Sequence, residues 1–222
     1  MVEEIKKRVE YYYDSYPTLE DLMGKGPLHA ELVHYLVEVL LWLFRGQVCA
    51  ICEDCNFYQT TDPDEYPIAP DIALIKGVPL QEEEISWVVG ETGPAPHVVI
   101  EIASKKTWRI DLQKKPAVYA SMGVGEYYVY DPHTPLLWRD RYPRLLGWHL
   151  EKANGQMVQL TADAQGRLWS PHLESWLVSD GKALRLYDRN NQRRLTEAEV
   201  AMRRAETLAE KLRALGVNPD EI

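Results

Sequence analysis

Phenylalanine, cysteine and positive charge are all scarce in this chain of 222 residues. It has 2 Phe and 3 Cys, and 34 aspartates and glutamates outnumber 25 lysines and arginines, so the formal net charge is −9. Domains that bind nucleic acid through their overall charge are basic. The chain as a whole is therefore not expected to be a non-specific duplex-binding protein, and any contact with nucleic acid requires a local basic patch.

Long hydrophobic runs are also missing. No apolar stretch approaches the roughly 18 residues of a membrane span, and the first residues, MVEEIKKRVEYYYD, lack the apolar segment of a secretory signal. The composition is otherwise that of a globular protein, with 45% hydrophobic and 27% charged residues. We expect a cytoplasmic protein whose main domain has a sizeable core.

The three cysteines, Cys49, Cys52 and Cys55, lie in the evenly spaced motif VCAICEDCNF. Closed zinc sites usually need four Cys or His ligands, and no fourth ligand is obvious nearby. We interpret the cysteines as partly buried thiols of a strand and turn in a reducing compartment. A metal or redox role is the alternative.

Hydrophobic periodicity predicts the order of the elements. A short charged helix and a loop are expected in 1–27, and longer helices at 29–44, within 110–122 and at 196–216. Strands are expected within 48–60, at 72–76, 97–104 and 126–131, with a polar excursion at 77–96. From 136 to 187 the pattern is β-rich (LLWRD, GWHLEK, MVQLTAD, RLWS), with a hairpin turn at SDGK. This order indicates an α/β or α+β core with a β-rich C-terminal extension, in a domain spanning 1–190.

The final segment, 191–222, contains an amphipathic helix. Its apolar residues alternate at spacings of three and four and form one stripe, which consists of Ala198, Ala201, Ala205, Leu208, Leu212 and Leu215. The stripe either packs on its own domain or pairs with a second subunit to form a homodimer.

The run VVIEIAS places one carboxylate, Glu101, inside an otherwise apolar strand. An unpaired ionised carboxylate in a dry interior is unfavourable by several kcal/mol or more. A partner must compensate Glu101, or the strand must end in a wet cleft.

A second carboxylate, Asp71, begins the apolar strand of PDIALI. If the two strands pair, Asp71 and Glu101 converge, and they must then share a proton or a cation. Mg²⁺ is satisfied by one or two carboxylates, a carbonyl and waters. The carbonyl of Ile102 is a plausible third ligand.

Basic residues follow the second strand. Lys105, Lys106, Arg109 and Lys114 form a candidate phosphate-contacting patch on an acidic chain. Lys115 lies near the start of the following helix, where its tip can reach a metal-bound water. Metal-assisted phosphodiester hydrolysis needs this combination of carboxylates, metal and cation.

The motifs PDIALI, VVIEIAS and DLQKKPAVYASMGVGEYYVYDP resemble the Uma-two family of putative restriction endonucleases, in the PD-(D/E)XK nuclease superfamily. The resemblance covers roughly residues 20–187. It implies a restriction-endonuclease-like fold, a central mixed sheet flanked by helices. It also implies a Mg²⁺- or Mn²⁺-dependent DNA endonuclease with Asp71 and Glu101 as metal ligands.

The resemblance also bears on further residues. The superfamily usually has a lysine two residues after the glutamate, where this chain has Ala103, and the Uma-type pattern moves that role to Lys115. An acidic residue on the first helix would match Glu31, with Glu38 as a rival and His29 at the helix start. Gln59 and Ser104 are further candidates to line the site.

A structural alternative stays open for each residue. Asp71 can be a turn residue after Pro70, and Glu101 can be a buried partner of Lys115. Glu31 can be an exposed residue near a helix start. The rival function is a non-catalytic member of the same fold that serves in binding or assembly.

Overall fold

The structure is a computed structural model, which describes residues 26–62, 66–79 and 86–219. The segment 1–27, where a short charged helix and a loop were expected, lies outside these ranges except for its last two positions. Along the described ranges, no helix combines the length and the apolar content that a membrane crossing requires.

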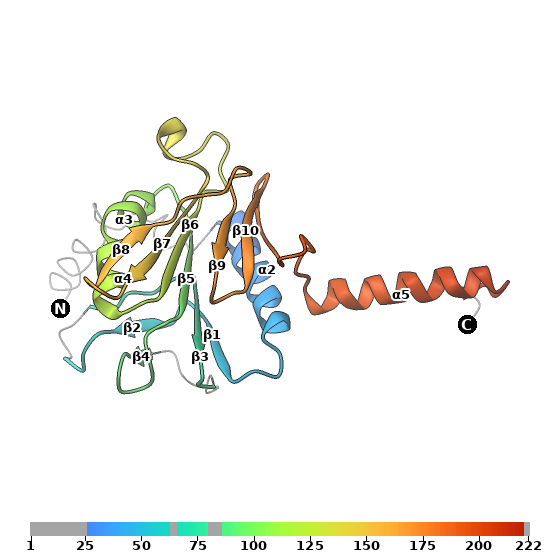
Figure 1. The fold of residues 1–222 in the computed structure, drawn as a ribbon, viewed down its shortest axis with the longest axis horizontal. Helices are drawn as coiled ribbons and strands as arrows, with labels where there is room; N and C mark the ends of the chain where they lie inside the picture. The colour runs from blue at the N-terminus through green and yellow to red at the C-terminus, as the bar shows by residue number, and fades with distance from the viewer. Residues whose placement is uncertain (1–25, 63–65, 80–85, 220–222) are drawn as a thin grey trace.

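A mixed six-stranded sheet forms the centre of the molecule (Figure 1). Its strands, in spatial order, are β1 (Cys49–Glu53), β3 (Ile72–Lys76), β5 (Val98–Ile102), β6 (Glu126–Tyr130), β7 (Leu145–Glu151) and β8 (Gln156–Gln159). Only β5 and β6 run parallel, and the other neighbours pair antiparallel. The predicted mixed sheet and α+β class are confirmed.

Both faces of the sheet are covered, which explains why its central strands are apolar at successive positions. One core lies between the sheet, helix α2 (Pro27–Leu43) and an antiparallel sheet of three strands. These strands are β9 (Leu168–Ser170), β10 (Ser175–Asp180) and β11 (Ala183–Tyr187). The other core lies under α3 (Trp108–Gln113) and α4 (Lys115–Met122), on the opposite face (Figure 1).

The helix expected within 110–122 is two helices. Pro116 stands in the first turn of α4 and has no N–H to continue the hydrogen bonding of α3, so the chain breaks at Lys114. Helix α4 ends as predicted, because Gly123 takes the left-handed conformation (φ +82°) that terminates a helix.

The strand expected within 48–60 is also divided. Asp54 has a positive φ of 55°, and β2 (Asn56–Tyr58) leaves the sheet to pair with β4 (Ser86–Val88) in a separate parallel ribbon. The segment LLWRD was wrongly predicted as a strand. It belongs to a loop that contains a 3₁₀ turn, Arg139–Arg141, because its apolar side chains pack on a core without joining a sheet.

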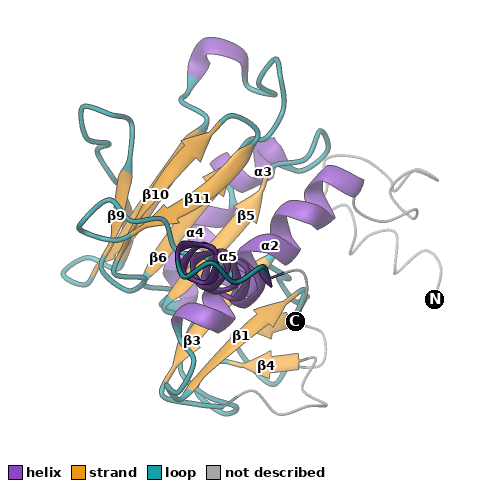
Figure 2. Ribbon diagram, turned by 90° about the vertical axis from the view of Figure 1, so that its right-hand side faces the viewer, coloured by secondary structure: helices purple, strands orange, loops and turns teal. Residues whose placement is uncertain are grey.

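Helix α5 (Glu197–Ala214) extends away from the rest of the molecule, and Figure 2 shows it nearly end-on. Thr196 and Glu199 form a reciprocal capping box that begins the helix. None of its residues is buried, and Met202 and Leu208 are 66% and 60% exposed. The apolar stripe therefore lies open along most of the helix.

Candidate active site

Asp71 immediately precedes β3, and Glu101 lies on the adjacent strand β5. Strands β3 and β5 pair antiparallel with Ile72 opposite Ile100, so continuing this register places Asp71 opposite Glu101. Residues opposite each other in a sheet point to the same face. Both carboxylates are buried, with relative exposures of 5% and 3%.

Two donors hold Asp71. The backbone N–H of Ile102 donates to its Oδ2 at 2.7 Å, and Nε2 of His29 lies 3.0 Å from the same oxygen. His29 comes from the first turn of α2. These contacts give Asp71 a defined orientation at the end of β3, beyond the role of a turn residue after Pro70.

Lys115 binds Glu101 from the first turn of α4. Its Nζ lies 2.7 Å from Oε1 of Glu101 and 2.9 Å from Oδ1 of Asp111. The hydroxyl of Tyr119 also donates to Oε1 of Glu101 at 2.7 Å. The buried Glu101–Lys115 pair anticipated as the structural alternative is therefore present, and it is part of a larger cluster.

Asp111 and Tyr119 are the members of this cluster that the sequence interpretation missed. Asp111 is only 1% exposed, and Tyr119 is equally buried. The signal was their spacing, since positions 111, 115 and 119 are each four apart and share one face of a helix. The break at Lys114 leaves these three side chains close together.

The cluster contains more acidic than basic side chains. Burial raises the pKa of Glu101 to about 8; the charge of Lys115 opposes this shift, and those of Asp71 and Asp111 add to it. Burial likewise raises the pKa of Asp111. Burial disfavours the charged form of Lys115, but Asp111 and Glu101 outweigh this effect and raise the pKa of Lys115. Lys115 therefore stays protonated, and it faces three carboxyl groups.

Ser104 contacts the cluster indirectly, through Thr107. Its Oγ is 2.9 Å from Oγ1 of Thr107, which in turn donates to Oδ2 of Asp111 at 2.9 Å. Ser104 also accepts from the backbone N–H of Thr107 at 3.2 Å. The turn before α3 thereby fixes Asp111, and Ser104 acts on the cluster only through Thr107.

Gln59 and Glu31 were the other residues predicted to line the site. The amide of Gln59 donates to Oγ of Ser121 on α4 at 2.9 Å. Glu31 is exposed on α2 and Glu38 half-buried, and the ion pairs and hydrogen bonds described for the cluster reach neither. The contact from α2 is made by His29.

The predicted basic patch borders the cluster. Lys105, Lys106, Arg109 and Lys114 are all exposed, on or beside α3. The guanidinium of Arg109 lies over the ring of Trp108, 4.5 Å from its centroid. An exposed run of positive charge thus stands next to a buried, predominantly acidic site.

The cysteines do not form a metal site. Cys52 and Cys55 are buried in the core under α3 and α4, and Cys49 is half-buried on β1. Over the described ranges, no three side chains of His, Cys, Asp or Glu are arranged to hold a metal ion. Any metal at Asp71 and Glu101 would have to complete its coordination with backbone or water oxygens.

The comparisons with known proteins identify the family of the chain. The family described as "Uma2: Putative restriction endonuclease" matches residues 3–173, which is more than half of the chain. The chain belongs to the Uma2 family. No curated protein matches it.

A solved structure, described as "a putative nuclease belonging to DUF820 from Anabaena variabilis ATCC 29413", is similar to the chain with a TM-score of 0.46 and 12% identity. The similarity covers 67% of this chain and 75% of that one.

Proposed function

We propose that the protein is a metal-dependent endonuclease that hydrolyses DNA phosphodiester bonds. The observation that carries the proposal is the convergence of Asp71, Glu101 and Lys115 in one buried cluster beside an exposed basic patch. Membership of a family described as "Putative restriction endonuclease" supports the same function.

The residues of the cluster fit a hard divalent cation such as Mg²⁺ or Mn²⁺. Three carboxylates face one lysine, so the cluster has an excess of acidic groups that a cation would balance. Both hydrogen bonds to Glu101 go to Oε1, and no described residue hydrogen-bonds its Oε2. Mg²⁺ commonly binds one or two protein carboxylates and keeps several waters, so Asp71 and Glu101 would suffice.

Ile102 suits the third position proposed from the sequence. Its N–H points toward Asp71. In an extended strand the N–H and C=O of one residue point to the same side. The carbonyl of Ile102 therefore also points to the side of Asp71, where it would complete the set of oxygen donors.

The roles of the residues follow from their charges. A bound divalent cation would acidify a water and neutralise charge on the phosphate. The raised pKa of Lys115 keeps it protonated, so it serves as a cation for the scissile phosphate and not as a base. Tyr119 orients Glu101, while His29 and the Ile102 N–H orient Asp71.

DNA is the proposed partner. Lys105, Lys106, Arg109 and Lys114 would supply phosphate contacts beside the cluster. A cytoplasmic location, expected from the sequence, suits a DNA substrate.

Addition of Mn²⁺ to the metal-free protein tests the proposal. A ligand of the folded state stabilises it by about 2.7 kcal/mol at a concentration of 100 Kd, which is a rise of about 5–10 °C in the thermal midpoint for a chain of this size. We expect this rise, together with Mn²⁺-dependent cleavage of duplex DNA.

The matched control is Asp71→Asn, which should abolish the rise. A parent protein that neither gains stability from Mn²⁺ nor cuts DNA would favour the non-catalytic rival. The closed Glu101–Lys115 pair is the observation that fits this rival.

We also propose that α5 pairs two subunits, since its stripe is open and a dimer supplies two sites for two strands. Deleting residues 191–222 should lower the mass measured in solution from that of a dimer to that of a monomer of the shortened chain. A second variant with Leu208→Ala and Leu212→Ala should weaken the dimer while the body stays folded. A shortened chain that still has the mass of a dimer would show that the pairing surface lies elsewhere.

A further inference from the structure

A loop between β6 and β7, residues 132–144, stands at the same end of the sheet as the candidate active site. Strands β5 and β6 are parallel, with Ile102 beside Tyr130, so both strands end at this edge. The loop, called the arm below, extends beyond the sheet (Figure 1). The arm was not among the residues predicted to contact nucleic acid.

The base of the arm is firmly held. Asp131 is fully buried and accepts hydrogen bonds from the backbone N–H groups of His133 and Leu137, at 2.9 and 2.5 Å. Arg144 spans the base by donating to the carbonyls of Asp131 and His133, at 2.8 and 2.9 Å. The two ends of the arm are therefore tied together, and its position relative to the sheet is fixed.

A pair of tryptophans joins the arm to the basic patch. Trp138 of the arm is buried, and its Nε1 donates to the carbonyls of Tyr142 and Pro143, both at 3.0 Å. Its ring packs against Trp108 at the start of α3, with 6.4 Å between centroids. The residue after each tryptophan is an exposed arginine, Arg109 on α3 and Arg139 on the arm.

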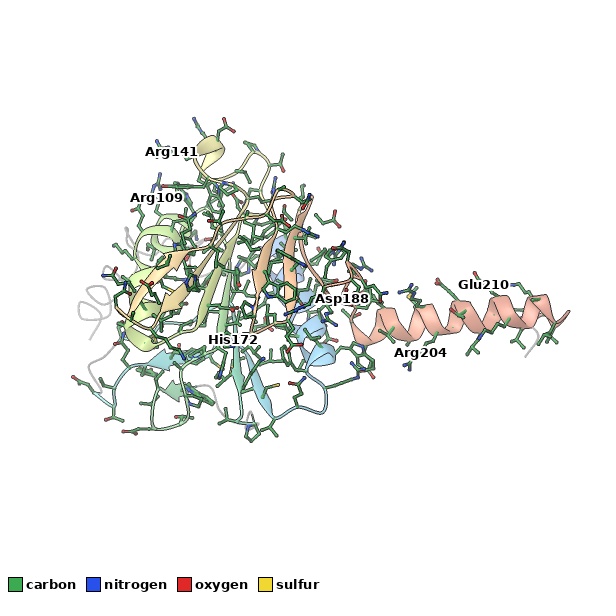
Figure 3. All side chains as sticks on the ribbon, viewed as in Figure 1. Arg109, Arg141, His172, Asp188, Arg204 and Glu210 are labelled. Carbon is green, nitrogen blue, oxygen red and sulfur yellow. The ribbon has the colours of Figure 1, made fainter. Side chains whose placement is uncertain are left out.

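The tip of the arm carries the sequence Arg139-Asp140-Arg141-Tyr142, all of it exposed. Within the part of the chain that the structure describes, neither Arg139 nor Arg141 forms a salt bridge. Arg139 has a positive φ of 54°, an unfavourable conformation for a non-glycine residue, which the packing of Trp138 holds in place. Figure 3 shows Arg109 and Arg141 pointing outward at the same end of the molecule.

We propose that the arm is a second nucleic-acid contact, which binds the phosphate backbone of duplex DNA beside the candidate active site. The guanidinium of arginine matches phosphate geometry, and tyrosine hydroxyls also contact phosphates. Two arginines that form no salt bridge among the described residues, held at a fixed place on a chain of charge −9, suit a polyanion more than a neutral or basic partner. This inference rests on the proposed function, because it takes DNA as the substrate.

The test measures the salt dependence of affinity for a short duplex, in EDTA so that no cleavage occurs. The variants are Arg139→Gln, Arg141→Gln and their combination. Each lost phosphate contact should lower the magnitude of the log–log salt slope by about 0.9, and the double variant by about 1.8. Lys105→Gln/Lys106→Gln tests the predicted patch in the same way.

Lys152→Gln is the control for net charge. Lys152 is exposed in the turn after β7, at the end of that strand far from the arm. This variant removes the same charge as Arg141→Gln and should keep the parental slope. All variants should keep the parental thermal midpoint, because neither arginine is packed in a core.

The results separate the proposal for the arm from the proposed nuclease function. A parental slope for the double variant, in a protein that cuts DNA, would overturn the arm proposal and leave the nuclease intact. A reduced slope in a protein that binds but never cuts DNA would support the arm and overturn the nuclease. A parent protein that binds no duplex would overturn both.

Discussion

Replacing Glu101 with glutamine should lower metal-dependent cleavage of DNA by at least about 100-fold, because a metal ligand contributes several kcal/mol of charge stabilisation in the transition state. The fold should survive. Lys115 keeps its ion pair with Asp111 at 2.9 Å, so the substitution leaves no buried lysine without a partner. It also removes the repulsion of Glu101 by Asp71 and Asp111. The measurements are cleavage of a supercoiled duplex and the affinity for Mn²⁺.

The same variant should change how the stability of the metal-free protein depends on pH. The pKa of Glu101 is about 8 in the folded state, against an ordinary value of 4.5. Between these values the folded protein binds the proton more tightly than the unfolded chain. The free energy of unfolding therefore falls as pH rises through this window, by at most about 1.4 kcal/mol per pH unit for one group. Glu101→Gln should flatten this decline.

The control is Glu91→Gln, which changes an exposed carboxylate and should keep the parental pH profile. The outcome that contradicts the metal site is specific: a large loss of stability in Glu101→Gln, with parental affinity for Mn²⁺. That result would mean that Glu101 serves the fold alone.

Replacing Lys115 with methionine should have the largest effect on stability. The side chain would keep its length and apolar stem, but Glu101 and Asp111 would lose their shared cation inside the protein. Breaking a buried pair in this way costs about 3–5 kcal/mol. Chemical denaturation without metal at pH 9, above the pKa of Glu101, measures the loss, which should shrink at acidic pH, where the two carboxylates are protonated.

Lys114→Met is the matched control. Lys114 is the neighbouring lysine and is exposed, so its replacement should change stability by no more than about 0.5 kcal/mol. Adding Glu101→Gln to Lys115→Met should recover part of the loss, because one uncompensated carboxylate is removed. Equal stabilities of the Lys114 and Lys115 variants would show that the cluster is not held by its ion pairs.

The strands that bear Asp71 and Glu101 could be predicted because each is a short apolar run with one carboxylate. Such a strand can be recognised without knowing which strands lie beside it, because a strand that is buried on both faces is apolar at successive positions. The convergence of the two carboxylates needed only the assumption that the strands pair, and the register of Ile72 with Ile100 supports it.

His29 and the segment LLWRD could not be placed in the same way. His29 reaches Asp71 across 42 positions of sequence, so its role depends on how α2 packs. In LLWRD, the run of apolar residues indicated burial correctly for Trp138, but such a run does not say whether a buried residue belongs to a strand or to a loop. In the structure, Trp138 is buried by its contact with Trp108 and belongs to a loop.

The exposure of α5 has a consequence for how this protein can diverge in evolution. Substitutions in a core are constrained by the volume of their neighbours, whereas every residue of α5 lies outside the core. Changes along this helix therefore avoid the penalty that accompanies changes in β3 or β5. Changes along this helix can therefore alter the surface that it binds without disturbing the sheet or its carboxylates, so the same body can be placed in different assemblies.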